Sequence, residues 1–194
     1  MEDPSFAWAV EDRETPYSCP GFDIVREEVR LPDGTETDFD YLDAPPSVVI
    51  LPLTADGAII LIREWREAVQ RVNRGLPTGT AEPNDADLRE TATRELEEET
   101  GYVAEDIEAL LTVEPANGVA AIEHHYFLAH GCTPTGTQSL DADETITVVE
   151  APYAEVLQQA MAGDIRDGRT LLGLLYYHAG RSDTLRNGPR KADL

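Results

Sequence analysis

Residues 79–102 carry the side chains with the clearest potential for chemistry. The segment reads GTAEPNDADLRETATRELEEETGY and places Glu95, Glu98 and Glu99 shortly before Gly101. Positions three and four apart share one edge of a helix, so these carboxylates would be neighbours. Each like-charge pair costs an exposed helix about 0.2–0.5 kcal/mol, and a hard cation such as Mg²⁺ or Mn²⁺ would relieve that repulsion. From the residues alone, the alternative is a solvated acidic helix face.

Local signals predict the helix that positions these carboxylates. Asn84 or Asp85 is the expected N-cap after Pro83, and Gly101 is the expected C′ residue, which gives a helix over residues 86–100. Its apolar stripe consists of Leu88, Ala92 and Leu96, which recur every four positions. The stripe would hold the helix against a core and leave the carboxylate edge available.

The segment resembles the Nudix box, whose pattern is G-x5-E-x7-R-E-U-x-E-E-x-G-U with U aliphatic. Residues 94–101, RELEEETG, match its second half position for position, and Tyr102 takes the last aliphatic place. The first half departs from the pattern. Counting from Gly79 puts Asp85 at the glutamate position, and eight residues instead of seven then separate it from Arg94. The metal-ligand edge depends only on residues from Arg94 onward, so the departure affects the role of Asp85.

The rest of the chain predicts an α/β fold, which the resemblance specifies as a Nudix α/β/α sandwich with a mixed central sheet and a small N-terminal β subdomain. After an irregular start, strands are expected at 22–30, 35–42, 47–53, 58–62, 107–114, 124–129 and 145–149, with closing helices at 153–161 and 170–179. The runs at 47–53 and 58–62 are apolar throughout and should be central strands. The expected domains are a tail and hairpin at 1–44, the Nudix domain at 45–180 and a tail at 181–194.

Several further segments look like the ADP-ribose pyrophosphatase branch of the Nudix superfamily. They include LPDG at 31–34, REWR at 63–66, LPTG at 76–79, LDADETI at 140–146 and GDIRDGRT at 163–170. By that likeness Arg66 contacts the phosphates of the substrate, for which an arginine fork is suited. Glu144 takes the place of a further carboxylate that acts as catalytic base or metal ligand.

The resemblance implies metal-assisted hydrolysis of a nucleoside diphosphate linked to another group. Glu95, Glu98 and Glu99, with the backbone carbonyl of Gly79 or Thr80, would hold Mg²⁺ or Mn²⁺. Glu99 and Glu144 are the expected catalytic carboxylates, and Arg94 is expected to orient a box glutamate. With ADP-ribose the products would be AMP and ribose 5-phosphate. The resemblance also implies a homodimer in which the N-terminal strands shape the nucleotide pocket of the partner.

Two alternatives stay open. The chain could hydrolyse another sugar nucleotide, a dinucleoside polyphosphate or a nucleoside triphosphate, because the box specifies the metal chemistry and the pocket specifies the leaving group. It could also be a nucleotide-binding regulator on a Nudix scaffold without turnover, although a module of that kind has no need for Glu95, Glu98 and Glu99 together.

The composition and charge of the chain indicate which partners and which environment to expect. The formal net charge is -23, and Lys191 is the one lysine. Nucleic acid is excluded as a partner because its phosphates would be repelled, and the charge favours an origin in a halophile, where molar salt screens surface carboxylates. No apolar run reaches the ~20 residues of a membrane span, and the acidic start is unlike a signal sequence, so a cytoplasmic protein is expected. Cys19 and Cys132 are expected to be unpaired thiols.

Overall fold

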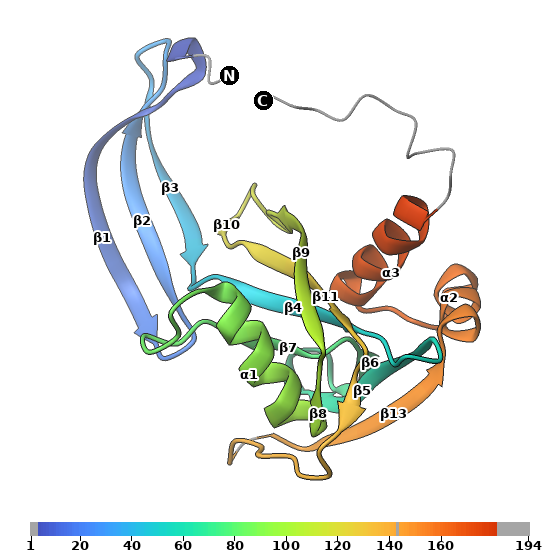
Figure 1. Cartoon of the computed structure of the whole chain (residues 1–194). Helices are drawn as coiled ribbons and strands as arrows, with labels where there is room; N and C mark the ends of the chain where they lie inside the picture. Colours follow the sequence, from blue (N-terminus) through green and yellow to red (C-terminus); the bar gives the residue numbers. More distant parts are fainter. Residues whose placement is uncertain (1–3, 143, 182–194) are drawn as a thin grey trace. The chain divides into compact units, whose positions relative to one another are not determined.

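The computed structural model describes residues 4–142 and 144–181 (Figure 1). These residues form two units, which we describe separately. The first holds the described residues up to Pro46 together with Val113–Glu123, and the second holds Ser47–Thr112 and the described residues from His124 onward. The expected division at residues 44 and 45 stays a prediction, and the expected tail lies, except for Arg181, outside the described residues.

The first unit is built on one sheet with the strand order β1-β2-β3-β10, preceded by a 3₁₀ turn at Pro4–Phe6. Its strands are β1 (Ala9–Cys19), β2 (Phe22–Arg30), β3 (Glu36–Asp43) and β10 (Ala120–Ala121). The pairs β1–β2 and β2–β3 are antiparallel, while β10 runs parallel to β3. The Leu31–Gly34 turn joins β2 to β3 as predicted, and Gly34 takes the positive φ of 86° that the turn needs.

The second unit contains mixed sheets and three helices. One sheet has the order β7-β4-β11-β9, another β13-β5-β6, and β12 pairs with β8. The strands are β4 (Ser47–Pro52), β5 (Ala58–Arg66), β6 (Arg71–Gly75), β7 (Thr78–Thr80), β8 (Tyr102–Val103), β9 (Asp106–Val113), β11 (His124–His130), β12 (Thr133–Pro134) and β13 (Ile146–Pro152). A 3₁₀ turn at Glu67–Val69 follows β5, and the helices are α1 (Leu88–Thr100), α2 (Tyr153–Ala162) and α3 (Gly168–Arg181).

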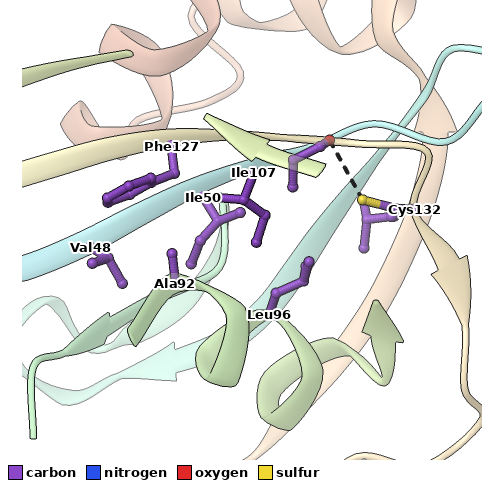
Figure 2. Packing of buried hydrophobic residues seen from close by; sticks show 9 residues of the cluster. Val48, Ile50, Ala92, Leu96, Ile107, Phe127 and Cys132 are labelled. Atoms are coloured by element: carbon purple, nitrogen blue, oxygen red, sulfur yellow. Dashed lines mark hydrogen bonds between the residues drawn. The ribbon is translucent and has the colours of Figure 1, made fainter. Parts of the chain in front are cut away.

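The two apolar runs are interior strands, as predicted. In β4, the four residues from Val48 to Leu51 have no exposed surface, and the strand lies between β7 and β11. Side chains alternate along a strand, so Val48 and Ile50 face one side of the sheet and Val49 and Leu51 the other. The first side packs against α1, where Ala92 and Leu96 complete a buried cluster with Phe127 (Figure 2).

Helix α3 packs on the opposite side from α1. Leu174 of α3 is fully buried, and Gly173 lies so close to Leu76 and Tyr126 that an added Cβ would approach the Leu76 methyl group to 2.9 Å. Tyr126 pairs with Val49 in the parallel register of β11 and β4, which places it on the side facing α3. Helices therefore cover both faces of a mixed sheet, and the predicted α/β/α fold is confirmed.

Two local predictions were wrong. The irregular start expected for the N-terminus is the long strand β1, whose residues are exposed apart from the half-buried Cys19. Helix α1 begins at Leu88 with Asp87 as its N-cap, not at residue 86 with Asn84 or Asp85. The Asp87 side chain accepts hydrogen bonds from the backbone N–H groups of Arg89 and Glu90, both at 2.9 Å. The predicted end at Gly101 is confirmed, with a φ of 68°.

We expect Asp87→Ala to lower the free energy of unfolding by about 1 kcal/mol, because two first-turn N–H groups of α1 lose their acceptor. Urea unfolding of metal-free protein at fixed salt measures the change. Asp164→Ala is the matched control, since Asp164 is exposed and lies outside α1. Its effect should stay within about 0.5 kcal/mol. Equal losses in the two variants would show that Asp87 has no capping role.

Candidate active site

Helix α1 and strand β7 position the predicted box carboxylates. The buried Ala92 and Leu96 anchor one face of α1 in the core, so Glu95 and Glu99 project from another face toward β7. Glu99 is 3% exposed, and its Oε2 accepts a 2.9 Å hydrogen bond from the backbone N–H of Thr78. Helix α1 therefore carries the Glu99 carboxylate, and the backbone of β7 holds it in place.

Glu95 approaches the backbone of Gly79 closely. A Cβ added at Gly79 would fall 1.8 Å from the carboxyl carbon of Glu95, so the Glu95 side chain would have to leave its place. The absence of a side chain on β7 therefore creates the space that the Glu95 carboxylate occupies. The structure brings Gly79 and Glu95 together, as the box resemblance implies.

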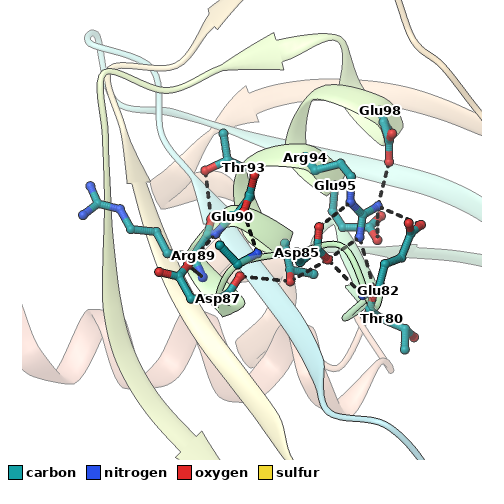
Figure 3. Close-up of polar contacts among 12 residues, drawn as sticks. Thr80, Glu82, Asp85, Asp87, Arg89, Glu90, Thr93, Arg94, Glu95 and Glu98 are labelled. Carbon is teal, nitrogen blue, oxygen red and sulfur yellow. Dashed lines mark hydrogen bonds and ion pairs between the residues drawn. The ribbon is translucent and has the colours of Figure 1, made fainter.

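Arg94 is the centre of a dense polar network (Figure 3). Its Nη1 donates to Glu95 Oε1 at 2.9 Å and to Glu98 Oε2 at 2.8 Å. Its Nη2 donates to the Thr80 carbonyl at 3.2 Å and to Asp85 Oδ2 at 3.0 Å, while Nε donates to Asp85 Oδ1 at 3.2 Å. Arg94 thus has carboxylate and carbonyl partners on all its nitrogens, which suits a positioning role toward Glu95 and Glu98.

Asp85 joins this network despite the extra residue between it and Arg94. It accepts from Arg94 through both carboxylate oxygens, and its Oδ2 also accepts from the Glu82 N–H and the Thr91 hydroxyl, both at 2.9 Å. These hydrogen bonds, led by that of Arg94, hold the pKa of Asp85 far below its usual range. The insertion therefore leaves an acidic partner for Arg94 in place.

The pKa values of Glu95 and Glu99 lie above that of an ordinary glutamate. Burial raises the pKa of Glu95 to about 7, opposed by Arg94 and reinforced by Glu98 and Glu144. Burial also raises the pKa of Glu99 to about 8, opposed by the Thr78 N–H and reinforced by the charges of Glu95, Glu144 and Glu64. At neutral pH the metal-free protein therefore keeps a proton on part of this pair.

The donor set has the chemistry of a hard-cation site. Glu95, whose side chain is 13% exposed, and the buried Glu99 offer carboxylate oxygens beside the Gly79 gap, and Mg²⁺ and Mn²⁺ prefer such ligands. Among the residues described, however, no group of three or more His, Cys, Asp and Glu side chains converges on one point. Arg94 takes oxygens of Glu95 and Glu98, and the Thr80 carbonyl is also its acceptor. The donor atoms are therefore of the kind that Mg²⁺ and Mn²⁺ prefer, but the described side chains are not already arranged around one metal position.

Glu144 lies in the loop before β13, close enough to raise the pKa of both Glu95 and Glu99. Its carboxylate Oε2 accepts from the Asp141 N–H at 3.0 Å, and its own N–H donates to the Asp141 carbonyl at 3.1 Å. These two bonds tie the Glu144 carboxylate and backbone to Asp141. Its assignment as catalytic base stays a prediction.

Arg66 at the end of β5 has an acidic partner that sequence analysis did not single out. Its Nη2 lies 2.7 Å from Glu64 Oε2. Residues two apart on a strand share a face, and that alternation was the available signal for Glu64. A second missed cation, Arg169, donates to the Thr78 hydroxyl at 3.4 Å and lies 3.6 Å from Asp167 Oδ1. Two arginine–carboxylate pairs, Arg66–Glu64 and Arg169–Asp167, thus lie beside the Glu99 site.

Comparisons with known proteins agree with this arrangement. The NUDIX domain model matches residues 43–171. The chain belongs to the NUDIX domain family. It is 29% identical over 165 residues to "ADP-ribose pyrophosphatase" of Bacillus subtilis (strain 168), covering 84% of this chain and 89% of that protein.

A second curated relative of this Nudix chain is "GDP-mannose pyrophosphatase" of Salmonella arizonae (strain ATCC BAA-731 / CDC346-86 / RSK2980), 30% identical over 138 residues, 68% of this chain and 72% of that protein. The structure titled "Crystal structure of ADP compounds hydrolase" superposes with a TM-score of 0.78 at 22% identity and covers 89% of this chain and 93% of that one. The family match and relatives confirm the predicted enzyme class, a Nudix pyrophosphohydrolase. In the part of the chain described, no helix has the length and apolar character needed to cross a membrane.

The raised pKa of Glu99 predicts how stability depends on pH in the absence of metal. The folded value is about 8 and the ordinary value is 4.5, so folding favours the protonated form. That contribution is fully present below the lower value and is lost as pH rises through about 8. In EDTA at constant salt, the melting temperature should therefore fall between about pH 5 and about pH 9 more steeply for wild type than for Glu99→Gln.

The matched control for this pH series is Glu108→Gln, which removes one charge from an exposed carboxylate that pairs with His130. It should keep the steep slope of the wild type below about pH 8. A Glu99→Gln slope indistinguishable from those of wild type and Glu108→Gln would refute the assignment of the proton to Glu99.

Proposed function

We propose that the chain hydrolyses ADP-ribose to AMP and ribose 5-phosphate with Mg²⁺ or Mn²⁺. The observation that supports it most is the pair formed by the partly buried Glu95 and the buried Glu99, held by Arg94 and Thr78 in a chain that resembles the Bacillus subtilis ADP-ribose pyrophosphatase over most of its length. A water oxygen forms a bond to one phosphorus, the bond from that phosphorus to the bridging oxygen breaks, and the second phosphate leaves with its ribose.

Each site residue has a separate task in this proposal. Glu95, Glu99 and Glu98, with the Gly79 carbonyl, hold the cation, which when bound supplies positive charge against the diphosphate and acidifies a bound water. Glu144 accepts the proton of the attacking water. Arg94 keeps Glu95 and Glu98 in place through hydrogen bonds at 2.9 Å and 2.8 Å. Arg66 binds the diphosphate through its guanidinium fork.

GDP-mannose is the second candidate substrate. The relative from Salmonella arizonae carries the name GDP-mannose pyrophosphatase and is 30% identical over 68% of this chain, against 29% over 84% for the ADP-ribose relative. Both substrates contain a diphosphate between a nucleoside and a sugar, so the same carboxylates and Arg66 would serve either. The residues that contact the base and the sugar would decide between them.

We expect the protein to release AMP from ADP-ribose in the presence of Mg²⁺, as measured by chromatography. The assay is repeated from low to multimolar KCl, since the net charge of -23 favours activity in high salt. Glu99→Gln should lower kcat by at least about 100-fold, because a metal ligand and a charged group are lost together. Glu108→Gln is the control and should retain the wild-type rate. GDP-mannose is assayed in parallel. Faster turnover of GDP-mannose would replace the substrate, and no turnover of either would refute the proposed function.

We further propose that the enzyme is a homodimer formed through the N-terminal sheet. Trp8, Val10 and Tyr17 are about half exposed on or beside β1, which is unusual for apolar residues of a strand. Within the first unit, Trp8, Phe39 and Tyr41 line a cavity of about 730 Å³, and aromatic rings of this kind suit a nucleobase. Both features support the implied role of these strands in the partner's nucleotide pocket.

Light scattering after size exclusion should therefore give twice the 21.3 kDa of one chain. Val10→Glu should shift the protein to the monomer, because it introduces a charge on the β1 surface. Met161→Glu, on the exposed part of α2, is the control and should leave the dimer intact. A monomeric wild type, or a Val10→Glu dimer of unchanged stability, would refute the proposed interface.

A further inference from the structure

Glu64 and Arg66 form an ion pair at the end of β5 that the hydrolytic roles above do not explain. Both side chains lie on the same face of the strand, and Glu64 is opposite Asn73 of β6 and Ile146 of β13. Neither cross-strand neighbour carries a charge. The Glu64 side chain is 14% exposed and that of Arg66 35% exposed, so the pair is largely shielded from water.

The contact within this pair is close but poorly directed. Nη2 of Arg66 lies 2.7 Å from Oε2 of Glu64. Nevertheless, Glu64 Oε2 and Arg66 Nε are both buried and, among the residues described, have no hydrogen-bond partner of adequate geometry. A guanidinium binds an oxyanion best through two parallel N–H donors, and here Nε is not used. Glu64 therefore neutralises Arg66 without occupying its fork.

A second cation acts on the same carboxylate. Burial raises the pKa of Glu64, opposed by Arg66 and, more weakly, by Arg169 and reinforced by the charge of Glu144. Arg169 is itself fixed beside Asp167 and the Thr78 hydroxyl, and the Thr78 N–H holds Glu99. Glu64 is thus placed between two arginines at the border of the Glu99 site. If Arg66 moved away, Arg169 would remain as a positive neighbour of Glu64.

We propose that Glu64 is the counter-ion of Arg66 in the free enzyme and that it yields Arg66 to the diphosphate of the substrate, while Arg169 continues to neutralise Glu64. The inference deepens the proposed function, since it rests on Arg66 as a ligand of the diphosphate. Glu64 is a positioning residue in this scheme, because it acts through Arg66 and touches no reacting atom.

The exchange favours ligands with high charge. A diphosphate has enough negative charge and enough oxygens to draw Arg66 away from Glu64 and to engage both Nε and Nη2. A ligand with a single phosphate offers less compensation for the broken pair. The cost of breaking the pair is the same for both ligands, so the monophosphate product, which gains less from Arg66, binds more weakly than the intact substrate.

The test measures binding of inorganic pyrophosphate by titration calorimetry in EDTA at one fixed salt concentration, so that no cation contributes. Glu64→Gln keeps the size of the side chain and removes its charge. We expect it to bind pyrophosphate about three to ten times more tightly than wild type. The gain should vanish in the Glu64→Gln/Arg66→Met double variant when it is compared with Arg66→Met.

Matched variants separate this effect from general electrostatics. Glu108→Gln changes the net charge equally at a distant exposed site and should bind as wild type does. Glu64→Met is a second variant of similar size for use if Glu64→Gln does not fold. An affinity that is unchanged, weaker or undetectable in the folded Glu64 variant would overturn the proposal. A gain that persists without Arg66 would overturn it as well.

The outcome is independent of the substrate assay. If wild type does not hydrolyse ADP-ribose but Glu64→Gln gains Arg66-dependent affinity for pyrophosphate, the proposed function fails and the counter-ion role stands. If wild type hydrolyses ADP-ribose and Glu64→Gln shows no such gain, the proposed function stands and the counter-ion role fails. Inhibition by AMP gives a second readout, expected to be stronger in Glu64→Gln than in wild type.

Discussion

The Glu95 and Glu99 carboxylates lie in a largely buried place on adjacent turns of one helix, and the surrounding structure has to compensate for their repulsion. Burial raises the pKa of both groups, and the charge of Glu95 raises that of Glu99 further. Arg94 supplies positive charge to Glu95, and the Thr78 N–H supplies a hydrogen bond to Glu99. Anchoring of α1 through Leu96 keeps these partners within reach. Packing of the core thus keeps the Glu95 and Glu99 carboxylates close together although their charges repel.

The inserted residue before α1 shows how this constraint was met in another way. Asp85 is shorter than the glutamate of the box pattern. With one more residue between them, Asp85 contacts Arg94 from a loop in which Asp87, not Asp85, caps the helix. The Glu82 N–H and the Thr91 hydroxyl fix the Asp85 carboxylate. The longer loop thus still gives Arg94 an acidic partner.

The parts of the structure predicted from sequence were those with strong local signals. The apolar runs that became β4 and β5, the Leu31–Gly34 turn and the Gly101 stop were all recognisable, because hydrophobic periodicity and glycine conformation act over a few residues. Strand β1 was missed because its exposed residues lack an apolar alternation. Glu64 and Arg169 were missed because their significance depends on neighbours that only tertiary structure supplies, Arg66 for one and Thr78 for the other.

The acidic composition affects the two kinds of ion pair differently. Exposed pairs such as Arg26–Asp40 are in contact with solvent ions, so molar salt weakens them along with the long-range repulsion of anionic ligands. The contacts of Arg94 with Asp85 and Glu95 are shielded, since these carboxylates are 8% and 13% exposed. High salt would therefore lower the barrier to approach of a diphosphate while leaving the geometry of the box carboxylates intact. The internal order of the site thus depends on shielded contacts of Arg94 with carboxylates, and the approach of an anionic ligand depends on screening by salt.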